Sequence, residues 1–177
     1  VLNRLEMVGE TLRHALEQLS KEIPSWLQAH VPSEWYVRYG RRFEQYRLPG
    51  QKEEQAALAE RIGADGLWLL NRLYQEQTVT STLSLEALAA LAVLRQVWLQ
   101  QYQVEDEVVR WRPAGQLPPA SILIESPYDS EARFGQKREL TWIGYRAHLS
   151  ESCEETEPHL VTQVKTTVAP TADISMT

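Results

Sequence analysis

"SPYDSEARFGQKRELTWIGYRAHL", residues 126–149, places Asp129 ahead of a group of basic side chains and then continues as an alternating segment. The basic residues that follow the aspartate are Arg133, Lys137, Arg138 and Arg146. In residues 141–149 the alternation of side chains predicts a β-strand that turns Ile143, Tyr145, Ala147 and Leu149 to one face. Local chemistry leaves two interpretations open: a charged surface turn, or one arm of a metal site that acts on a phosphate backbone.

Composition limits the class of protein. The chain has 177 residues, of which 43% are hydrophobic and 24% charged, and this indicates a globular protein of one medium domain or two small ones. The net charge of −6 argues mildly against a dedicated nucleic-acid-binding module. The single cysteine, Cys153, permits no intramolecular disulfide and fits a reducing compartment, so we expect a cytoplasmic protein. The longest apolar run, residues 87–94, is far shorter than the ~20 residues of a membrane span.

The N-terminal segment, residues 2–23, has the leucine spacing of an amphipathic helix that ends at Pro24. Gly9 lies on the apolar stripe and predicts a close crossing with another element. Two interpretations remain: a dimerising coiled coil, or a helix that packs against its own domain. The second is favoured because about three heptads are the minimum for a coiled coil.

Residues 32–49 predict a second helix, bounded by Pro32-Ser33 and Pro49-Gly50. Its aromatic residues share one face, and they are Trp35, Tyr39, Phe43 and Tyr46. Its arginines lie mostly off that face, and they are Arg38, Arg41, Arg42 and Arg47. This arrangement suits either an aromatic core with solvated arginines or a surface that meets DNA.

The remaining pattern predicts an α+β protein. Residues 52–77 are expected to form a helix, a glycine turn at 63–66 and a second helix. Residues 84–106 are expected to form a buried central helix that is capped by Ser84. After Glu107 the period changes, and strands are predicted at 107–112, 121–126, 140–149 and 159–167. The acidic loop from residue 150 to 158 is expected to connect the last two strands as a hairpin. We therefore divide the chain into a helical N-terminal region, 1–112, and a second unit, 113–177.

Other site chemistries find little support in the residues. Cys153 lies in an acidic loop, which raises the pKa of a thiol and blunts it as a nucleophile. His148, Cys153 and His159 could surround a zinc ion, but a structural zinc site usually has four ligands at characteristic spacing. Asp129 follows an apolar segment, and a carboxylate at the end of a strand can hold Mg²⁺.

An ordered run of motifs covers residues 126–173, "SPYDSEARFGQKRELTWIGYRAHLSESCEETEPHLVTQVKTTVAPTAD". It matches S-P-Y-D-x-E-A-R, then K-R-x-x-x-W-x-G-Y-[KR]-x-H-L, then P-H-L-[IV]-T-x-V, then T-x-A-x-x-x-D. The upstream stretches "LNRLEMVGETLRHAL", "VPSEWYVRYGRRFEQYRLP" and "ERIGADGLWLL" are similar to the helical region that precedes these motifs. In these features the chain resembles a bacterial insertion-sequence transposase of the DDE class.

This resemblance implies the first strands of an RNase H-like catalytic domain, which uses three carboxylates and Mg²⁺ to cut transposon ends and join them to target DNA. It implies Asp129 as the first catalytic carboxylate and metal ligand, with Glu125 as the alternative, while Asp173 is interpreted as a helix cap. The residues expected on the DNA backbone are Arg133, Lys137, Arg138 and Arg146. DNA and a further copy of the chain are the implied partners, and no membrane is expected.

The second catalytic Asp and the final Glu are expected beyond residue 177, which makes the RNase H-like domain incomplete at its C-terminus. The chain would then carry at most one of three metal ligands, and we expect no strand transfer by it alone. Whether this chain is itself an enzyme is left open. The alternative is a non-enzymatic DNA-binding or oligomerisation module of the same ancestry, with Arg38, Arg41 and Arg42 on phosphates, and a decayed remnant is the third possibility.

Overall fold

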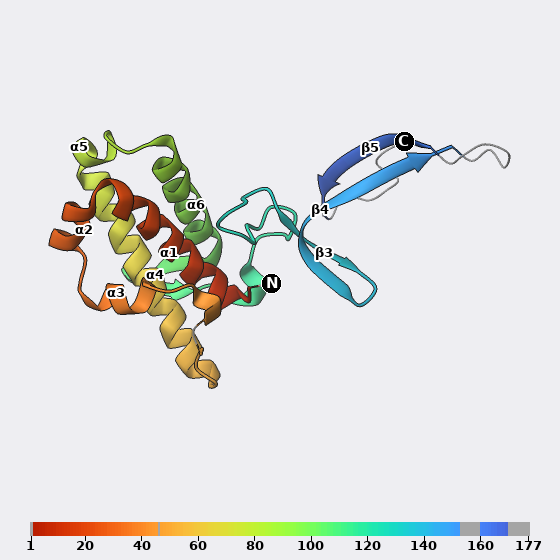
Figure 1. Cartoon of the computed structure of the whole chain (residues 1–177). Helices are drawn as coiled ribbons and strands as arrows, with labels where there is room; N and C mark the ends of the chain where they lie inside the picture. The colour runs from red at the N-terminus through yellow and green to blue at the C-terminus, as the bar shows by residue number, and fades with distance from the viewer. Residues whose placement is uncertain (1, 46, 153–159, 170–177) are drawn as a thin grey trace. The chain divides into compact units, whose positions relative to one another are not determined.

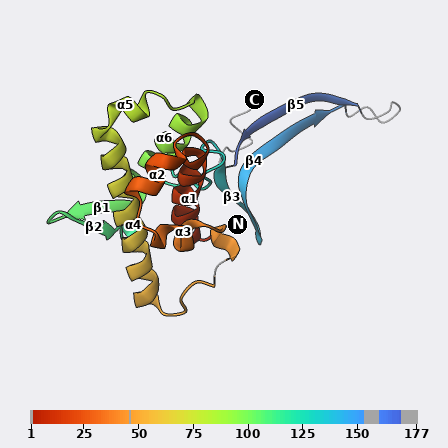
Figure 2. The ribbon, with the colours of Figure 1, turned by 60° about the vertical axis from the view of Figure 1, so that its left-hand side comes forward.

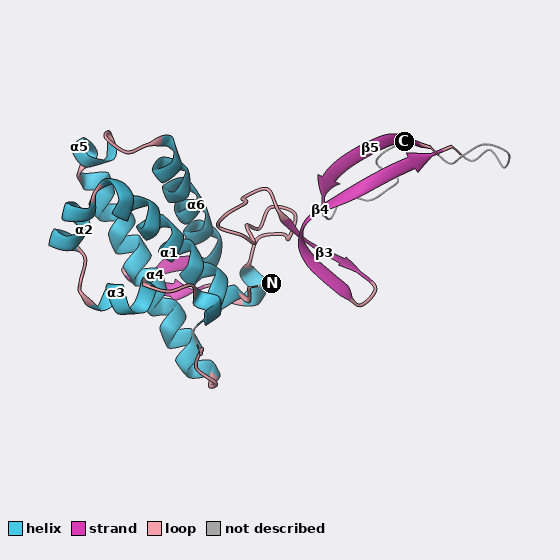
Figure 3. Cartoon of the chain, in the orientation of Figure 1, coloured by secondary structure: helices cyan, strands magenta, loops and turns pink. Residues whose placement is uncertain are grey.

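The computed structural model describes residues 2–45, 47–152 and 160–169. Contacts divide the chain into two compact units, and we call residues 2–118 the helical unit and the described residues from 119 onward the sheet unit. The α+β prediction is confirmed, because helices fill the first unit and small antiparallel sheets follow them (Figures 1 and 3). The sequence placed the division after residue 112, whereas the contacts divide the chain between Pro118 and Pro119.

The described residues of the helical unit form six α-helices, two short 3-10 helices and one hairpin. The helices are α1 (Arg4–Glu22), α2 (Pro24–His30), α3 (Glu34–Tyr39), α4 (Lys52–Gln75), α5 (Gln77–Thr80) and α6 (Leu85–Gln101). The 3-10 helices are η1 (Phe43–Gln45) and η2 (Ala114–Gln116), and the hairpin strands are β1 (Tyr102–Glu105) and β2 (Val108–Trp111). Among these described residues, no helix is long and apolar enough to cross a membrane.

Helix α1 forms the centre of the helical unit. Asn3 caps it, because its side chain accepts from the Glu6 amide while the Glu6 carboxylate accepts from the Asn3 amide. Leu12 and Leu19 are fully buried, and α1 packs on α6 and α4 of its own unit. The structure therefore shows α1 packed within its own domain, which was the favoured alternative to a coiled coil.

The segment after α1 keeps its predicted aromatic face but forms less helix than expected. Of the residues that the structure describes between 32 and 49, only α3 and η1 are helical. Trp35, Tyr39 and Phe43 are buried, as in the interpretation of an aromatic core, while Tyr46 lies outside the described residues. A Cβ on Gly9 would overlap the Phe43 ring, which confirms the close crossing predicted at this glycine.

The expected break at residues 63–66 was wrong, because α4 runs without interruption through both glycines. A Cβ on Gly63 would overlap the Tyr102 ring, and one on Gly66 would overlap the Trp98 ring. The Trp98 indole donates to the Gly63 carbonyl at 2.8 Å. The glycines are therefore places where aromatic rings reach the backbone of a straight helix.

Helix α6 begins at its predicted cap, since the Ser84 hydroxyl accepts from the Ala87 amide. It ends at Gln101, several residues earlier than predicted, because Tyr102 is extended and begins β1. In the turn that follows β1, Asp106 and Glu107 have positive φ angles of 49° and 65°. Two consecutive positive φ values suit a tight hairpin turn. The resulting β1–β2 hairpin lies against α4 (Figure 2).

The sheet unit is a three-stranded antiparallel meander. Its strands are β3 (Arg133–Lys137), β4 (Leu140–Glu151) and β5 (Val161–Val168), in the order β3-β4-β5. The two predicted strands at 140–149 and 159–167 are confirmed as β4 and β5, and β3 was not predicted. The predicted strand at 121–126 was wrong. The amides of Ile122 and Leu123 instead donate to the Pro119 carbonyl, which closes a turn there.

Candidate functional site

Asp129 lies in the loop that leads into β3, and its carboxylate organises that loop. Its Oδ1 accepts from the amides of Glu131 and Ala132, both at 3.1 Å. The Tyr145 hydroxyl on β4 lies 3.0 Å from both Oδ1 and Oδ2. Asp129 is therefore fixed by its own turn and by the neighbouring strand, while among the described residues Oδ2 accepts from Tyr145 alone.

Tyr145 is a site residue that the sequence analysis did not assign. Loss of hydration, followed by the hydrogen bond to the Asp129 carboxylate, raises the pKa of the Tyr145 hydroxyl above its usual 10. The hydroxyl therefore remains a donor to Asp129 at neutral pH. Its position could have been suspected from the alternation of the strand, but the approach of the loop to it depends on tertiary structure.

Arg133 holds the same loop from the other side. Its Nε donates to the Ser121 carbonyl at 2.9 Å, and its Nη1 donates to the carbonyls of Ser130 and Ala132. Two of the three guanidinium nitrogens, Nε and Nη1, therefore donate hydrogen bonds to backbone oxygens of the sheet unit. Burial raises the pKa of Glu125, the alternative first ligand, and the positive charge of Arg133 partly offsets this rise.

The strand register gathers the basic residues on one face. Arg133 pairs with Gly144, and Lys137 pairs with Leu140, so both share a face with Trp142 and Arg146. On the β5 side, His148 pairs with Lys165, which adds a further cation to that face. We call this set the cationic face, and its members are Arg133, Lys137, Trp142, Arg146, His148 and Lys165. Among the described strand residues, no Asp or Glu shares it.

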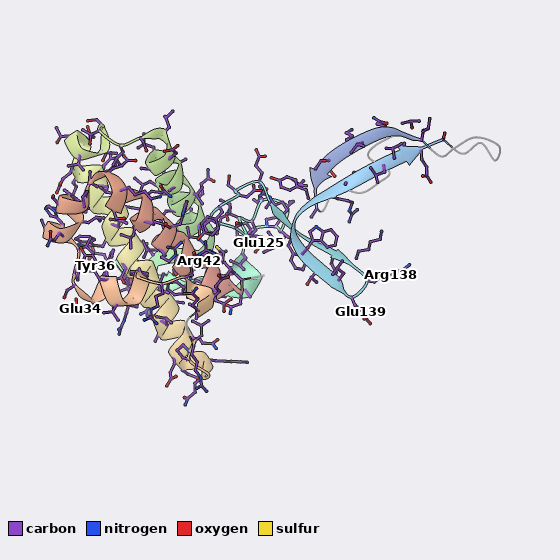
Figure 4. The ribbon with its side chains drawn as sticks, viewed as in Figure 1. Glu34, Tyr36, Arg42, Glu125, Arg138 and Glu139 are labelled. Atoms are coloured by element: carbon purple, nitrogen blue, oxygen red, sulfur yellow. The ribbon has the colours of Figure 1, made fainter. Side chains whose placement is uncertain are left out.

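Two exposed cations of this unit lie at the β3–β4 turn, and Lys165 on β5 is also exposed. Lys137 and Arg138 are exposed, and Arg138 occupies the turn beside Glu139 (Figure 4). Further along β4, the Arg146 guanidinium lies 5.9 Å from the centre of the Trp142 ring. The four predicted basic residues are thus spread along the sheet, with Arg133 at its base and Lys137 and Arg138 at the turn.

The resemblance implies a Mg²⁺ ion beside Asp129. Asp129 Oδ2 is a hard oxygen donor with spare capacity, which fits one ligand of such an ion. Within residues 2–45, 47–152 and 160–169, no group of three His, Cys, Asp or Glu side chains comes together. Asp173 lies outside the described residues, and so do Cys153 and His159, two of the three possible zinc ligands. The third, His148, has its Nε2 atom 2.9 Å from Thr167 Oγ1.

The arginines of the alternative interpretation lie in the helical unit, and they have different surroundings. Arg38 forms a close ion pair with Asp65, which also accepts from the Tyr39 hydroxyl at 2.6 Å. Arg42 lies 3.6 Å from Glu44, and Arg41 is exposed. Arg38 therefore stabilises the packing of α3 on α4, which leaves Arg41 and Arg42 as the accessible pair.

Trp142 lies on the same face as Arg146, as the alternation in residues 141–149 predicts, whereas Lys165 was not predicted as a neighbour of the basic residues. A hairpin register between the two predicted strands would have suggested Lys165, but the register is set by a loop that the sequence pattern does not define. Comparison of the chain with protein-family models, with curated proteins and with solved structures found no match.

Proposed function

We propose that this chain is part of a DDE-class transposase and that its sheet unit is the beginning of an RNase H-like domain that contacts DNA. The cleavage and strand transfer of such a domain depend on divalent metal. Support comes from the ordered motif run of residues 126–173, which in its described part forms a β-meander with Asp129 beside its first strand. The observation that carries the proposal is the cationic face, because it concentrates positive charge in a chain of net charge −6.

The cationic face has the chemistry of a phosphate-binding surface. Of this face, Lys137 at the β3–β4 turn and Lys165 on β5 are exposed, and the exposed Arg138 of the turn lies next to Lys137 in the chain. Such contacts hold a nucleic-acid backbone in place without reading its sequence. Arg133 has a positioning role in this scheme, because its bonds to loop carbonyls hold the segment that carries Asp129.

Asp129 is the proposed first metal ligand. Bound Mg²⁺ would activate a nucleophile and stabilise the leaving oxygen of a phosphodiester. The role of this chain's own residues is to present Asp129 Oδ2 in a fixed orientation. The Tyr145 hydroxyl and two backbone amides provide that orientation.

DNA binding separates this proposal from its helical alternative. We would measure the affinity of the chain for a labelled DNA duplex by fluorescence anisotropy, in EDTA and over a series of salt concentrations. The double variant Lys137→Glu/Arg138→Glu should weaken binding and reduce the slope of log affinity against log salt by about 2, as expected for two lost phosphate contacts.

The matched control is Arg41→Glu/Arg42→Glu, which makes the same charge change on the helical unit. Under the proposal this control leaves most of the affinity and the salt slope intact. A loss confined to the control would favour the helical DNA-binding module. Equal binding by the unaltered chain and both variants would contradict a role for either surface.

A further inference from the structure

A long apolar groove runs over the surface of the helical unit between α4, α6 and the β1–β2 hairpin. Its volume is about 830 Å³, and all of its lining residues belong to this unit. Leu73, Leu91 and Trp98 are buried side chains that line it. Tyr74 and Leu99 also line it and remain 78% and 66% exposed, so the groove and these side chains form one apolar patch.

The groove exists because α6 is apolar on both of its sides. One side packs against α1, as the sequence predicts for a central helix. The other side carries Leu88, Ala92 and Leu99, which line the groove at the spacing of one helix face. The predicted central helix is therefore only half covered by the described residues of its own unit.

The charge of the groove points to the chemistry of its partner. Its charged lining residues are Arg95 and Arg112, and no Asp or Glu is among the residues that line it. Within the described part of the chain, Arg95 makes no hydrogen bond or ion pair. Arg112 donates through Nη2 to the Leu99 and Tyr102 carbonyls, whereas its buried Nε has no hydrogen-bond partner there.

The dimensions of the groove favour a helix over a small molecule. Leu88 and Leu99 are eleven residues apart on α6 and so span about 16 Å, or about three turns of a facing helix. Tyr74, Leu99 and Val104 are lining side chains that remain largely exposed, and an extended partner could cover all three. Grooves of this kind commonly accept the apolar face of an amphipathic helix.

We propose that the groove is a docking site for an acidic amphipathic helix of a partner protein. Its apolar face packs over Leu91, Trp98 and Leu99, and a carboxylate beside that face pairs with Arg95. This function is separate from DNA contact by the sheet unit, because every residue that carries it lies in the helical unit.

The test uses a labelled synthetic helix of about 16 residues, with leucines along one face at i, i+4, i+7 and i+11 and glutamates beside them. The full chain should bind it, and Arg95→Glu should weaken binding about fivefold to tenfold by reversing the groove's free charge. Leu99→Ser should also weaken binding while leaving the fold intact, since this side chain is largely exposed. The matched control is Arg61→Glu, an exposed arginine of α4 outside the groove, which should bind as the unaltered chain does.

Two further peptides and one assembly measurement complete the test. A peptide with lysines in place of glutamates should bind more weakly, and one with scrambled leucines should not bind. Equal binding of the acidic and basic peptides, or no binding of either, would overturn the proposal. A dimer in sedimentation velocity that dissociates with Leu99→Ser would identify a second copy of the chain as the occupant and would overturn it equally.

Discussion

The helical unit and the sheet unit bury their apolar residues to very different extents. Helices α1, α4 and α6 enclose fully buried side chains such as Leu12, Leu69 and Leu94. In the described sheet unit the buried hydrophobic residues are Ile124, Ala132 and Ala169, while Leu149 and its cross-strand partner Val164 are largely exposed. The difference indicates that the helical unit stabilises itself through its core, whereas the sheet unit depends mainly on its strand ladder and on loop hydrogen bonds.

The comparison is tested most strongly by the same truncation in both units. Leu12→Ala should lower the free energy of unfolding by about 3 kcal/mol, because it leaves a cavity in a fully packed core. Leu149→Ala should change it by less than about 0.5 kcal/mol, because 66% of this side chain is exposed. The measurement is urea unfolding followed by circular dichroism, with hydrogen exchange to assign the change to one unit. Similar losses from both truncations would show that the exposed sheet face is covered in solution.

A smaller loss in the free energy of unfolding is expected at Gly66, where the Trp98 ring packs against the helix backbone. A Cβ on Gly66 would overlap the Trp98 ring, and overpacking of this kind costs about 1–3 kcal/mol. Alanine also gains about 1 kcal/mol over glycine inside a helix, so the net loss from Gly66→Ala should be about 0–2 kcal/mol. Gly115→Ala is the control, because nothing lies within 4 Å of its added Cβ. Stabilisation by Gly66→Ala would mean that the ring moves aside freely.

The same two units show what the sequence could predict. Heptad leucines, Pro24 and the Ser84 cap act through neighbouring residues, and for that reason the ends of α1 and the start of α6 were predicted correctly. Gly63 and Gly66 were wrongly predicted to form a turn. The aromatic rings that pack against them belong to residues more than thirty positions later in the chain, which a local pattern does not reveal.

The candidate site follows the same rule. Asp129 and its basic neighbours could be named from their order in the chain and from the family resemblance. The bond from Tyr145 to Asp129 depends on how a loop returns to β4, and the place of Lys165 depends on the strand register. Neither is encoded in a local pattern.

The smallest predicted effect concerns the junction between α1 and α6, where local and tertiary signals meet. The Glu22 carboxylate accepts from the Ser84 amide at 2.8 Å and from the Ser84 hydroxyl, and these hydrogen bonds lower the pKa of Glu22 below its usual 4.5. A carboxylate whose pKa is lower in the folded state contributes stability above its unfolded pKa and loses it as pH falls through the folded pKa. Glu22→Gln should therefore reduce the urea midpoint slightly at pH 7, and this difference should shrink as the pH falls below 4.5.

Glu54→Gln provides the control for that measurement, because it removes one exposed carboxylate from the first turn of α4 without touching Ser84. A difference for Glu22→Gln that persists unchanged into acid would show that the amide replaces the carboxylate poorly for steric reasons. The Ser84 bond would then join the two helices by its geometry and not by its charge. A difference that shrinks in acid would show that charge at the end of α1 helps to fix the start of α6, the helix whose outer face lines the proposed docking groove.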